Sequence, residues 1–95
     1  MVKYEAMILL DPTLEDAQRD AMIETIKGII AADGEVGEVN IMGIQKTAYP
    51  INKKNEAFYF VIEFAATPQL PKELDRRLKI SDNVMRHIII NKDEK

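Results

Sequence analysis

The chain has 95 residues, of which 46% are hydrophobic and 31% are charged. This length fits one domain over residues 1–95 and excludes two, and the balance is typical of a folded soluble protein. The absence of cysteine excludes disulfides and thiolate chemistry, and no apolar run approaches the roughly 20 residues that span a bilayer. With no secretory-signal pattern at the start, we expect a cytoplasmic protein that does not enter a membrane.

The first half of the chain predicts a strand, a helix and a second strand. Alternating apolar residues predict a strand over 4–10. Apolar residues at helical spacing then predict a helix over 13–32, with Thr13 as its N-cap and Gly34 as a left-handed C-cap. A long strand is expected over 36–51.

The second half predicts a strand, a helix and a last strand. A polar hairpin loop is expected over 52–56, followed by the most regular strand over 57–66. The second helix is expected to begin near Pro71, with an apolar stripe of Leu70, Leu74 and Leu78. The last strand is expected over 84–90, with a polar tail from about residue 91.

The element order is therefore strand-helix-strand-strand-helix-strand, or βαββαβ. This order is that of the split βαβ, or ferredoxin-like, α+β fold. Right-handed crossovers place both helices on one face of a four-stranded antiparallel sheet. The expected strand order is four-one-three-two, so the second and fourth strands should lie at the edges.

The sheet face without helices is expected to carry many apolar residues. By the two-residue period these are Met7, Leu9, Tyr59, Val61, Ile88 and Ile90. The second strand adds Ile41 and Met42 in an uncharged edge segment, although edge strands are usually guarded by charge. This apolar surface predicts a protein partner or self-association.

The chain has few residues of the types that catalyse reactions. We therefore expect neither an enzyme nor a cofactor, metal or small-molecule substrate. Ser81 is the only serine and His87 the only histidine, and acidic pairs such as Glu15 and Asp16 lack metal-ligand spacing. The strand segment 57–61 partly matches an RNA-recognition signature. Its phenylalanines, however, share the face opposite Glu63, so we expect core packing in place of base stacking.

Basic residues gather late in the chain. Lys79 and Arg86 flank the turn at 81–83, and together with Lys3 they are expected to form one local basic patch able to contact phosphate. The alternative is an ordinary solvated surface with scattered charges. Arg76 and Arg77 most simply pair with acids on the second helix.

Three segments carry a family resemblance: the opening 4–12, the run Ala48-Tyr49-Pro50-Ile51-Asn52-Lys53 after Gly43, and Asp82-Asn83-Val84 followed by Arg86. In this order and spacing, from about residue 2 to about residue 92, the chain resembles the bacterial small-subunit ribosomal protein six family. The chain departs from that family at Gln45, where a basic residue is usual, and at Thr47, where a leucine is usual.

The resemblance implies a structural component of the small ribosomal subunit that binds the central domain of small-subunit ribosomal RNA (rRNA) together with the basic ribosomal protein eighteen. A basic partner also accounts for the acidic net charge. The expected RNA-binding residues are Lys3, Tyr4, Lys79, Asn83, Arg86, His87 and Lys92. The expected partner-binding residues are Met7, Leu9, Ile41, Met42, Tyr59 and Val61.

Two other classes of function share this topology. A small regulatory domain would dimerise through its sheet and bind a metabolite, and a stable dimer would favour it. An acylphosphatase-type enzyme would need an anion-binding loop with an adjacent arginine, and the sequence shows no such loop.

Overall fold

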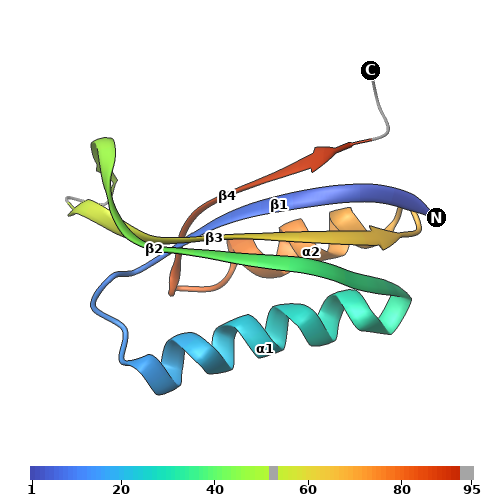
Figure 1. The fold of residues 1–95 in the computed structure, drawn as a ribbon, viewed down its shortest axis with the longest axis horizontal. Helices are drawn as coiled ribbons and strands as arrows, with labels where there is room; N and C mark the ends of the chain where they lie inside the picture. Colours follow the sequence, from blue (N-terminus) through green and yellow to red (C-terminus); the bar gives the residue numbers. More distant parts are fainter. Residues whose placement is uncertain (52–53, 93–95) are drawn as a thin grey trace.

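The computed structural model describes residues 1–51 and 54–92, with the backbone alone at 48–51 and 54. Its strands and helices follow the predicted order. They are β1 (Val2–Leu10), α1 (Asp16–Asp33), β2 (Gly34–Ile51), β3 (Lys54–Ala66), α2 (Leu70–Lys79) and β4 (Val84–Asn91). The strands pair antiparallel in the order β2-β3-β1-β4, so β2 and β4 form the edges, and the two helices lie on one side of the sheet (Figure 1). The predicted ferredoxin-like fold is confirmed.

The core lies between the helices and the sheet face that they cover. Alternate residues of the two central strands point into it, namely Tyr4, Ala6, Ile8, Leu10, Phe58, Phe60, Ile62 and Phe64. From the helices it receives Ile23, Ile26 and Ile30 of α1, and Leu70, Leu74 and Leu78 of α2. The predicted stripe of α2 is confirmed, and Pro71 stands in its first turn, where a missing N–H costs nothing.

The start of α1 differs from the prediction. Helix α1 begins after Glu15, whose backbone N–H donates to Gln18 Oε1 at 3.2 Å as part of a capping box. Thr13 lies before the helix, where its hydroxyl and its N–H both donate to Asp11 Oδ1, at 2.7 and 2.9 Å. Asp11 therefore forms a turn with Thr13, because an aspartate side chain can accept a hydrogen bond from the backbone two residues on. Thr13 is engaged in this turn and does not cap the helix as expected.

Gly34 is not a left-handed cap, since its φ is −169° and its backbone is extended. Helix α1 passes directly into β2 at this residue. A Cβ built on Gly34 would lie 2.4 Å from the Ala65 carbonyl oxygen and 2.8 Å from Ala66 Cβ. The glycine is therefore required by the close approach of β3 and not by its backbone conformation.

The predicted bulge at Gly43 is confirmed, because the pairing of β2 with β3 shifts between Ile41 and Gly43, and Gly43 has φ +82°. Beyond it the β2–β3 hairpin bends away from the helices (Figure 1). The expected hairpin loop at 52–56 is shorter than predicted, since β3 already begins at Lys54. Residues 52–53 and the last part of the expected tail, 93–95, lie outside the described residues.

Candidate partner and nucleic-acid interface

The face of the sheet away from the helices carries a continuous apolar strip. Strand pairing aligns Ile88, Met7 and Val61 in one row across β4, β1 and β3. The next row places Leu9 between Arg86 and Tyr59. We call Met7, Tyr59, Val61, Ile88 and Ile90 the open-face strip; Ile88 and Ile90 are 44% and 50% exposed, and the other three are half-buried.

Leu9 belongs to the same face but is only 6% exposed. It is flanked by Tyr59 on one side and Arg86 on the other, near the end of the central strand β1. The expectation that Leu9 lies on the surface offered to a partner is therefore wrong for the protein on its own. Both neighbours have long side chains, which commonly cover apolar surface beside them, and this accounts for the burial of Leu9.

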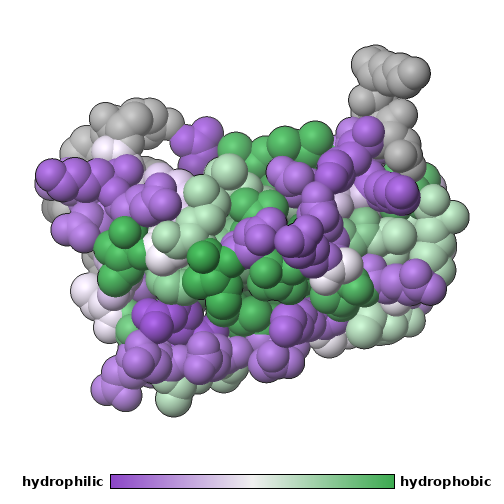
Figure 2. Space-filling model, in the orientation of Figure 1, coloured by the Kyte–Doolittle hydropathy of each residue, from purple (hydrophilic) through white to green (hydrophobic). Residues whose placement is uncertain are grey.

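The edge strand β2 is apolar and exposed around its bulge, with Ile41, Met42 and Ile44 all on the surface. Ile41 pairs with Phe60, so it lies on the helix side of the sheet and not beside the open-face strip. In Figure 2 an apolar band crosses the middle of the molecule where this edge lies, above the polar surface of α1. The predicted uncharged edge is thus present but faces a different direction from the strip.

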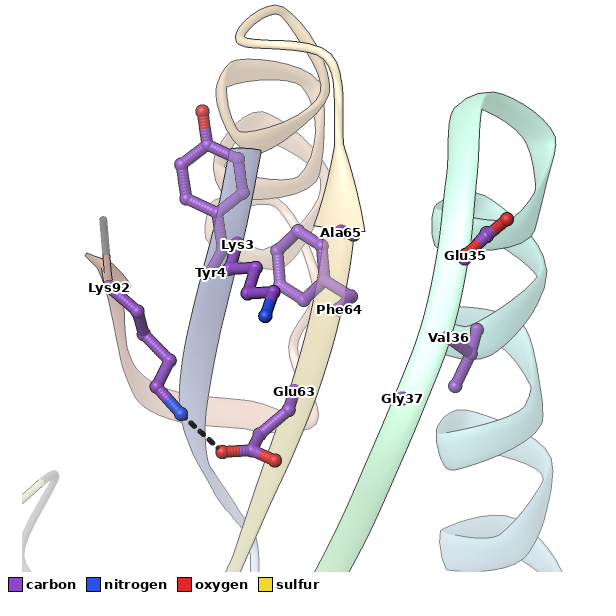
Figure 3. A pocket seen from close by; sticks show the side chains of 9 residues that line it. All are labelled: Lys3, Tyr4, Glu35, Val36, Gly37, Glu63, Phe64, Ala65 and Lys92. Carbon is purple, nitrogen blue, oxygen red and sulfur yellow. Dashed lines mark hydrogen bonds and ion pairs between the residues drawn. The ribbon is translucent and has the colours of Figure 1, made fainter. Parts of the chain in front are cut away.

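One end of the open face is polar and hollowed. A cavity of about 300 Å³ there is lined by residues of β1, β2 and β3 and by Lys92, which follows β4 (Figure 3); among them are Lys3, Glu35, Gly37 and Glu63. Lys92 Nζ lies 2.5 Å from Glu63 Oε1 and 3.8 Å from a carboxylate oxygen of Glu5. The hydrogen bond to Glu63 raises the pKa of the Lys92 ammonium. Sequence reasoning missed this cluster, although alternation alone places Glu5 and Glu63 on the open face.

The basic residues do not form the single patch that was predicted. Arg86 pairs with Leu9 at one end of β1, while the backbone N–H of Lys92 donates to the carbonyl of Lys3, at 2.9 Å, at the other end. Lys3 and Leu9 are six positions apart along an extended strand, which is about 20 Å. Lys3 and Lys92 therefore belong to the polar end of the sheet, and Arg86 to the opposite end.

Lys79 and Asn83 lie at the same end of the molecule as Arg86. The turn that holds Asn83 is tied to the end of β1, because Asp11 N–H donates to the Asn83 carbonyl at 3.0 Å. Lys79, in the last turn of α2, lies 3.0 Å from Asp75 Oδ2 and is largely exposed. These residues and Arg86 are the part of the predicted RNA-binding set that the fold brings to one end.

His87 and Tyr4 lie on the helix side of the sheet. His87 Nε2 is 2.6 Å from Asp75 Oδ1, with the histidine side chain only 11% exposed. Hydrogen bonds from His87 and then Lys79 lower the pKa of Asp75. Tyr4 is 6% exposed and stacks on Phe64, with ring centroids 5.4 Å apart. Tyr4 is thus a core residue, contrary to its expected place on an RNA-binding surface, because alternation from Glu5 turns it inward.

No helix among the described residues is long and apolar enough to cross a membrane. The site so far consists of an uncovered apolar sheet face, an apolar edge and basic residues at two separate ends. Its geometry is that of a surface for macromolecular partners, since a contiguous apolar strip rimmed by polar residues marks such a surface.

Comparison with known proteins agrees with this geometry. The family model described as Ribosomal protein S6 matches residues 3–91. A small ribosomal subunit protein bS6 of Clostridium kluyveri is 50% identical over 96 residues that cover the whole of both chains. Another bS6, of Alkaliphilus oremlandii, is 44% identical over 90 residues, which are 95% of this chain and 96% of that protein.

The fold agrees as well. The crystal structure of 30S ribosomal protein S6 from Thermotoga maritima matches with a TM-score of 0.92 at 30% identity, over 97% of this chain and 88% of that chain. A family match over nearly the whole length and a common fold together establish the relationship. The chain therefore belongs to the ribosomal protein S6 family of the small ribosomal subunit.

Proposed function

We propose that this chain binds the central domain of small-subunit rRNA jointly with ribosomal protein eighteen, as a structural and non-enzymatic component. Its family places the chain in the small ribosomal subunit and hence in the cytoplasm. The observation that carries the proposal is the open-face strip, which the chain's own helices leave uncovered. Such a surface is costly in water unless a protein covers it.

The charge of the chain supports joint binding over independent binding. A net charge of −3 gives little attraction for phosphates, which supply most of the non-specific affinity of RNA-binding proteins. A basic protein seated on the open-face strip adds the missing positive charge. The acidic residues Glu5 and Glu63 at the polar end of the same face favour a basic partner over an acidic one.

The RNA contacts are assigned to the end of the molecule that carries Lys79, Asn83 and Arg86. Arg86 and Lys79 supply phosphate contacts, and Asn83 positions ribose or backbone from its turn. Lys3 and Lys92 provide a second, weaker point at the polar end. His87 contributes from the β4 edge by holding Asp75, and Tyr4 by fixing the course of β1 from inside the core.

The partner contacts are assigned to Met7, Tyr59 and Val61 in the open-face strip, with Leu9 beneath them. Ile41 and Met42 extend the contact along the β2 edge, where exposed apolar side chains accompany unpaired backbone groups. The bulge at Gly43 turns the edge, so a partner that covers both surfaces wraps around β2.

The test is binding to an rRNA central-domain fragment across a salt series, with and without ribosomal protein eighteen. We expect tight, salt-sensitive binding only when both proteins are present. Val61→Arg should abolish the joint binding, while Arg77→Gln, a charge change on the helix layer, should leave it intact. Failure of the pair to bind would refute the proposal, and a stable dimer of this chain through its sheet would favour the regulatory alternative.

A further inference from the structure

The helix layer carries a groove on the side of the molecule away from the open sheet face. Two adjoining cavities of about 320 and 400 Å³ run along it between α1 and α2, and both are lined by Thr25, Ile29 and Arg77. The floor is apolar, with Ile26 and Leu78 beneath. Ile80, at one end of the groove, is 69% exposed, although exposure of an apolar isoleucine side chain to water is unfavourable.

One wall of the groove consists of small residues. Along α1, exposed small side chains recur at four-, four-, three- and four-residue steps, which is one stripe of a helix; they are Ala17, Ala21, Thr25, Gly28 and Ala32. The last three line the groove. A ridge of this kind allows another helix to approach closely, because it has no long side chains to displace.

Gly28 within this ridge has no explanation inside the monomer. It lies in the middle of α1, where glycine is less favourable than every residue except proline. A Cβ built on Gly28 meets nothing within 4 Å, so the chain's own packing does not require its absence. Gly34, by contrast, is required by β3. The bare backbone at Gly28 thus fits a contact that comes from outside.

The charges beside the groove identify the outside element. On the flank of α1 away from the groove, the exposed acids Asp16, Asp20 and Glu24 follow one another at four-residue steps. Asp16 and Glu24 also form exposed ion pairs within the helix, with Arg19 and Lys27. On the α2 side, Arg76 and Arg77 are 60% and 53% exposed at the side chain and share one acid, Glu73. An acidic α1 and a basic α2 on either side of one apolar groove make the surface complementary to itself.

We propose that the helix layer is a self-association surface that takes a second copy of this chain. The small ridge of each α1 lies in the α1–α2 groove of the other copy, around a two-fold axis. A two-fold axis turns the acidic flank of one α1 over the other copy's α2, where Asp20 and Glu24 meet Arg76 and Arg77. The open-face strip stays uncovered, so this pairing does not compete with the proposed ribosomal partner and does not depend on it.

The first test is sedimentation velocity of the whole chain from about 1 µM to about 1 mM, a range that covers weak pairs. We expect reversible dimers whose Kd rises with salt, because the ion pairs lie at the surface. Gly28→Gln should weaken dimerisation at least about tenfold by overfilling the contact. The same change should raise the thermal midpoint of the monomer, since glutamine favours a helix more than glycine does.

Ile88→Gln is the control, because Ile88 is exposed on the open sheet face and does not line the groove, and this variant should dimerise like the unmodified chain. A chain that stays monomeric throughout the range would overturn the proposal. A dimer that Gly28→Gln leaves intact, or that Val61→Arg on the open face disrupts, would overturn it too, since the contact would then lie elsewhere.

A charge exchange tests the pairing of the two helices directly. A copy with Asp20→Lys and Glu24→Lys has two basic helices, and a copy with Arg76→Glu and Arg77→Glu has two acidic helices. Neither should pair with itself, because like charges then face each other, yet an equimolar mixture should form dimers. A mixture that stays monomeric while both copies remain folded would contradict the assigned orientation.

Discussion

The two faces of the sheet are made of the same kinds of residues and differ in what covers them. On the helix side, Ile8, Phe60 and Ile62 are fully buried. On the open side, Met7, Val61 and Ile88 occupy the intervening positions and remain accessible. Because neighbours in a strand point to opposite faces, the sheet lines an internal core on one side and leaves an uncovered apolar surface on the other. Apolar character by itself does not tell the two apart, and coverage by helices does.

The largest effect is expected from Phe60→Ala. Phe60 is fully buried beneath the helices, so the change should lower the free energy of unfolding by about 3–5 kcal/mol through lost burial and a cavity. Urea denaturation of the purified chain measures it. Phe60 is among the largest side chains in the core, so a loss near 1 kcal/mol would mean that the core repacks around the gap.

Val61→Ala is the paired control, one residue along the same strand but on the other face. It should cost less than about 1 kcal/mol of unfolding free energy, because the side chain is already partly in water. Its effect on binding of the proposed basic partner should be the greater of the two changes. Equal losses of stability in both variants would abolish the distinction between the faces.

Leu9→Ala sharpens the comparison, because Leu9 lies on the open face and is nevertheless buried. We expect a loss of about 2–3 kcal/mol of unfolding free energy, between the values for Phe60→Ala and Val61→Ala. Thermal or urea unfolding measures it. A loss below 1 kcal/mol would show that Tyr59 and Arg86 cover Leu9 only loosely, and would return Leu9 to the accessible strip.

Arg86→Ala separates binding from stability on the open face. Arg86 is exposed at the end opposite Lys3. Its removal should weaken the proposed joint RNA binding about tenfold. It should also reduce the slope of log affinity against log salt concentration by about one, the value for one phosphate contact. The thermal midpoint should hardly change. Filter binding at several salt concentrations measures the first and calorimetry the second, with Arg77→Gln as control. An equal loss of stability would make Arg86 a structural residue.

The sequence was sufficient for the fold because the hydrophobic periodicity and the residues that mark turns and bulges indicate the same structure in nearly every element. Alternation marked the strands, helical spacing marked Leu70, Leu74 and Leu78, and glycine marked the bulge at Gly43. One error arose where two local signals competed, and the other where a long-range contact overrode a local signal. The Asp11 carboxylate accepts hydrogen bonds from Thr13 in a turn before the helix, whereas Thr13 was expected to be the N-cap. Gly34 is required by the close approach of β3 and does not end α1 in a left-handed turn.

The site was less predictable, because it depends on which strands are neighbours and on how far apart residues lie along them. Alternation placed Met7, Tyr59 and Val61 on the open face, but it gave no sign that Leu9 would be covered from both sides. The single basic patch failed because Lys3 and Arg86 each lie near the start of a strand, and the starts of the antiparallel strands β1 and β4 lie at opposite ends of the sheet. Tyr4 turned inward since its neighbour Glu5 takes the open face. Strand register depends on residues that are far apart in the sequence, whereas the alternation of side chains along a strand is a local property.

The smallest effect is expected on the outer surface of α2, where charges and not packing are at stake. Hydrogen bonds from Arg76 and Arg77 lower the pKa of Glu73 from 4.5 to about 2. A depressed carboxyl pKa stabilises the fold above the unfolded value and loses that contribution as pH falls, here between about 4.5 and about 2. Glu73→Gln should therefore be slightly less stable than the parent chain at neutral pH, and the two should converge toward pH 2.

Acid titration followed by circular dichroism measures this difference as a shift in the unfolding midpoint. The shift should shrink in high salt, because Glu73 and its partners are solvent-exposed and exposed ion pairs contribute little. If Glu73→Gln instead lowered stability as much as Leu9→Ala, surface charge would rival burial in holding α2 to the sheet. The covered face would then owe its coverage to ion pairs as well as to the stripe of leucines beneath the helix.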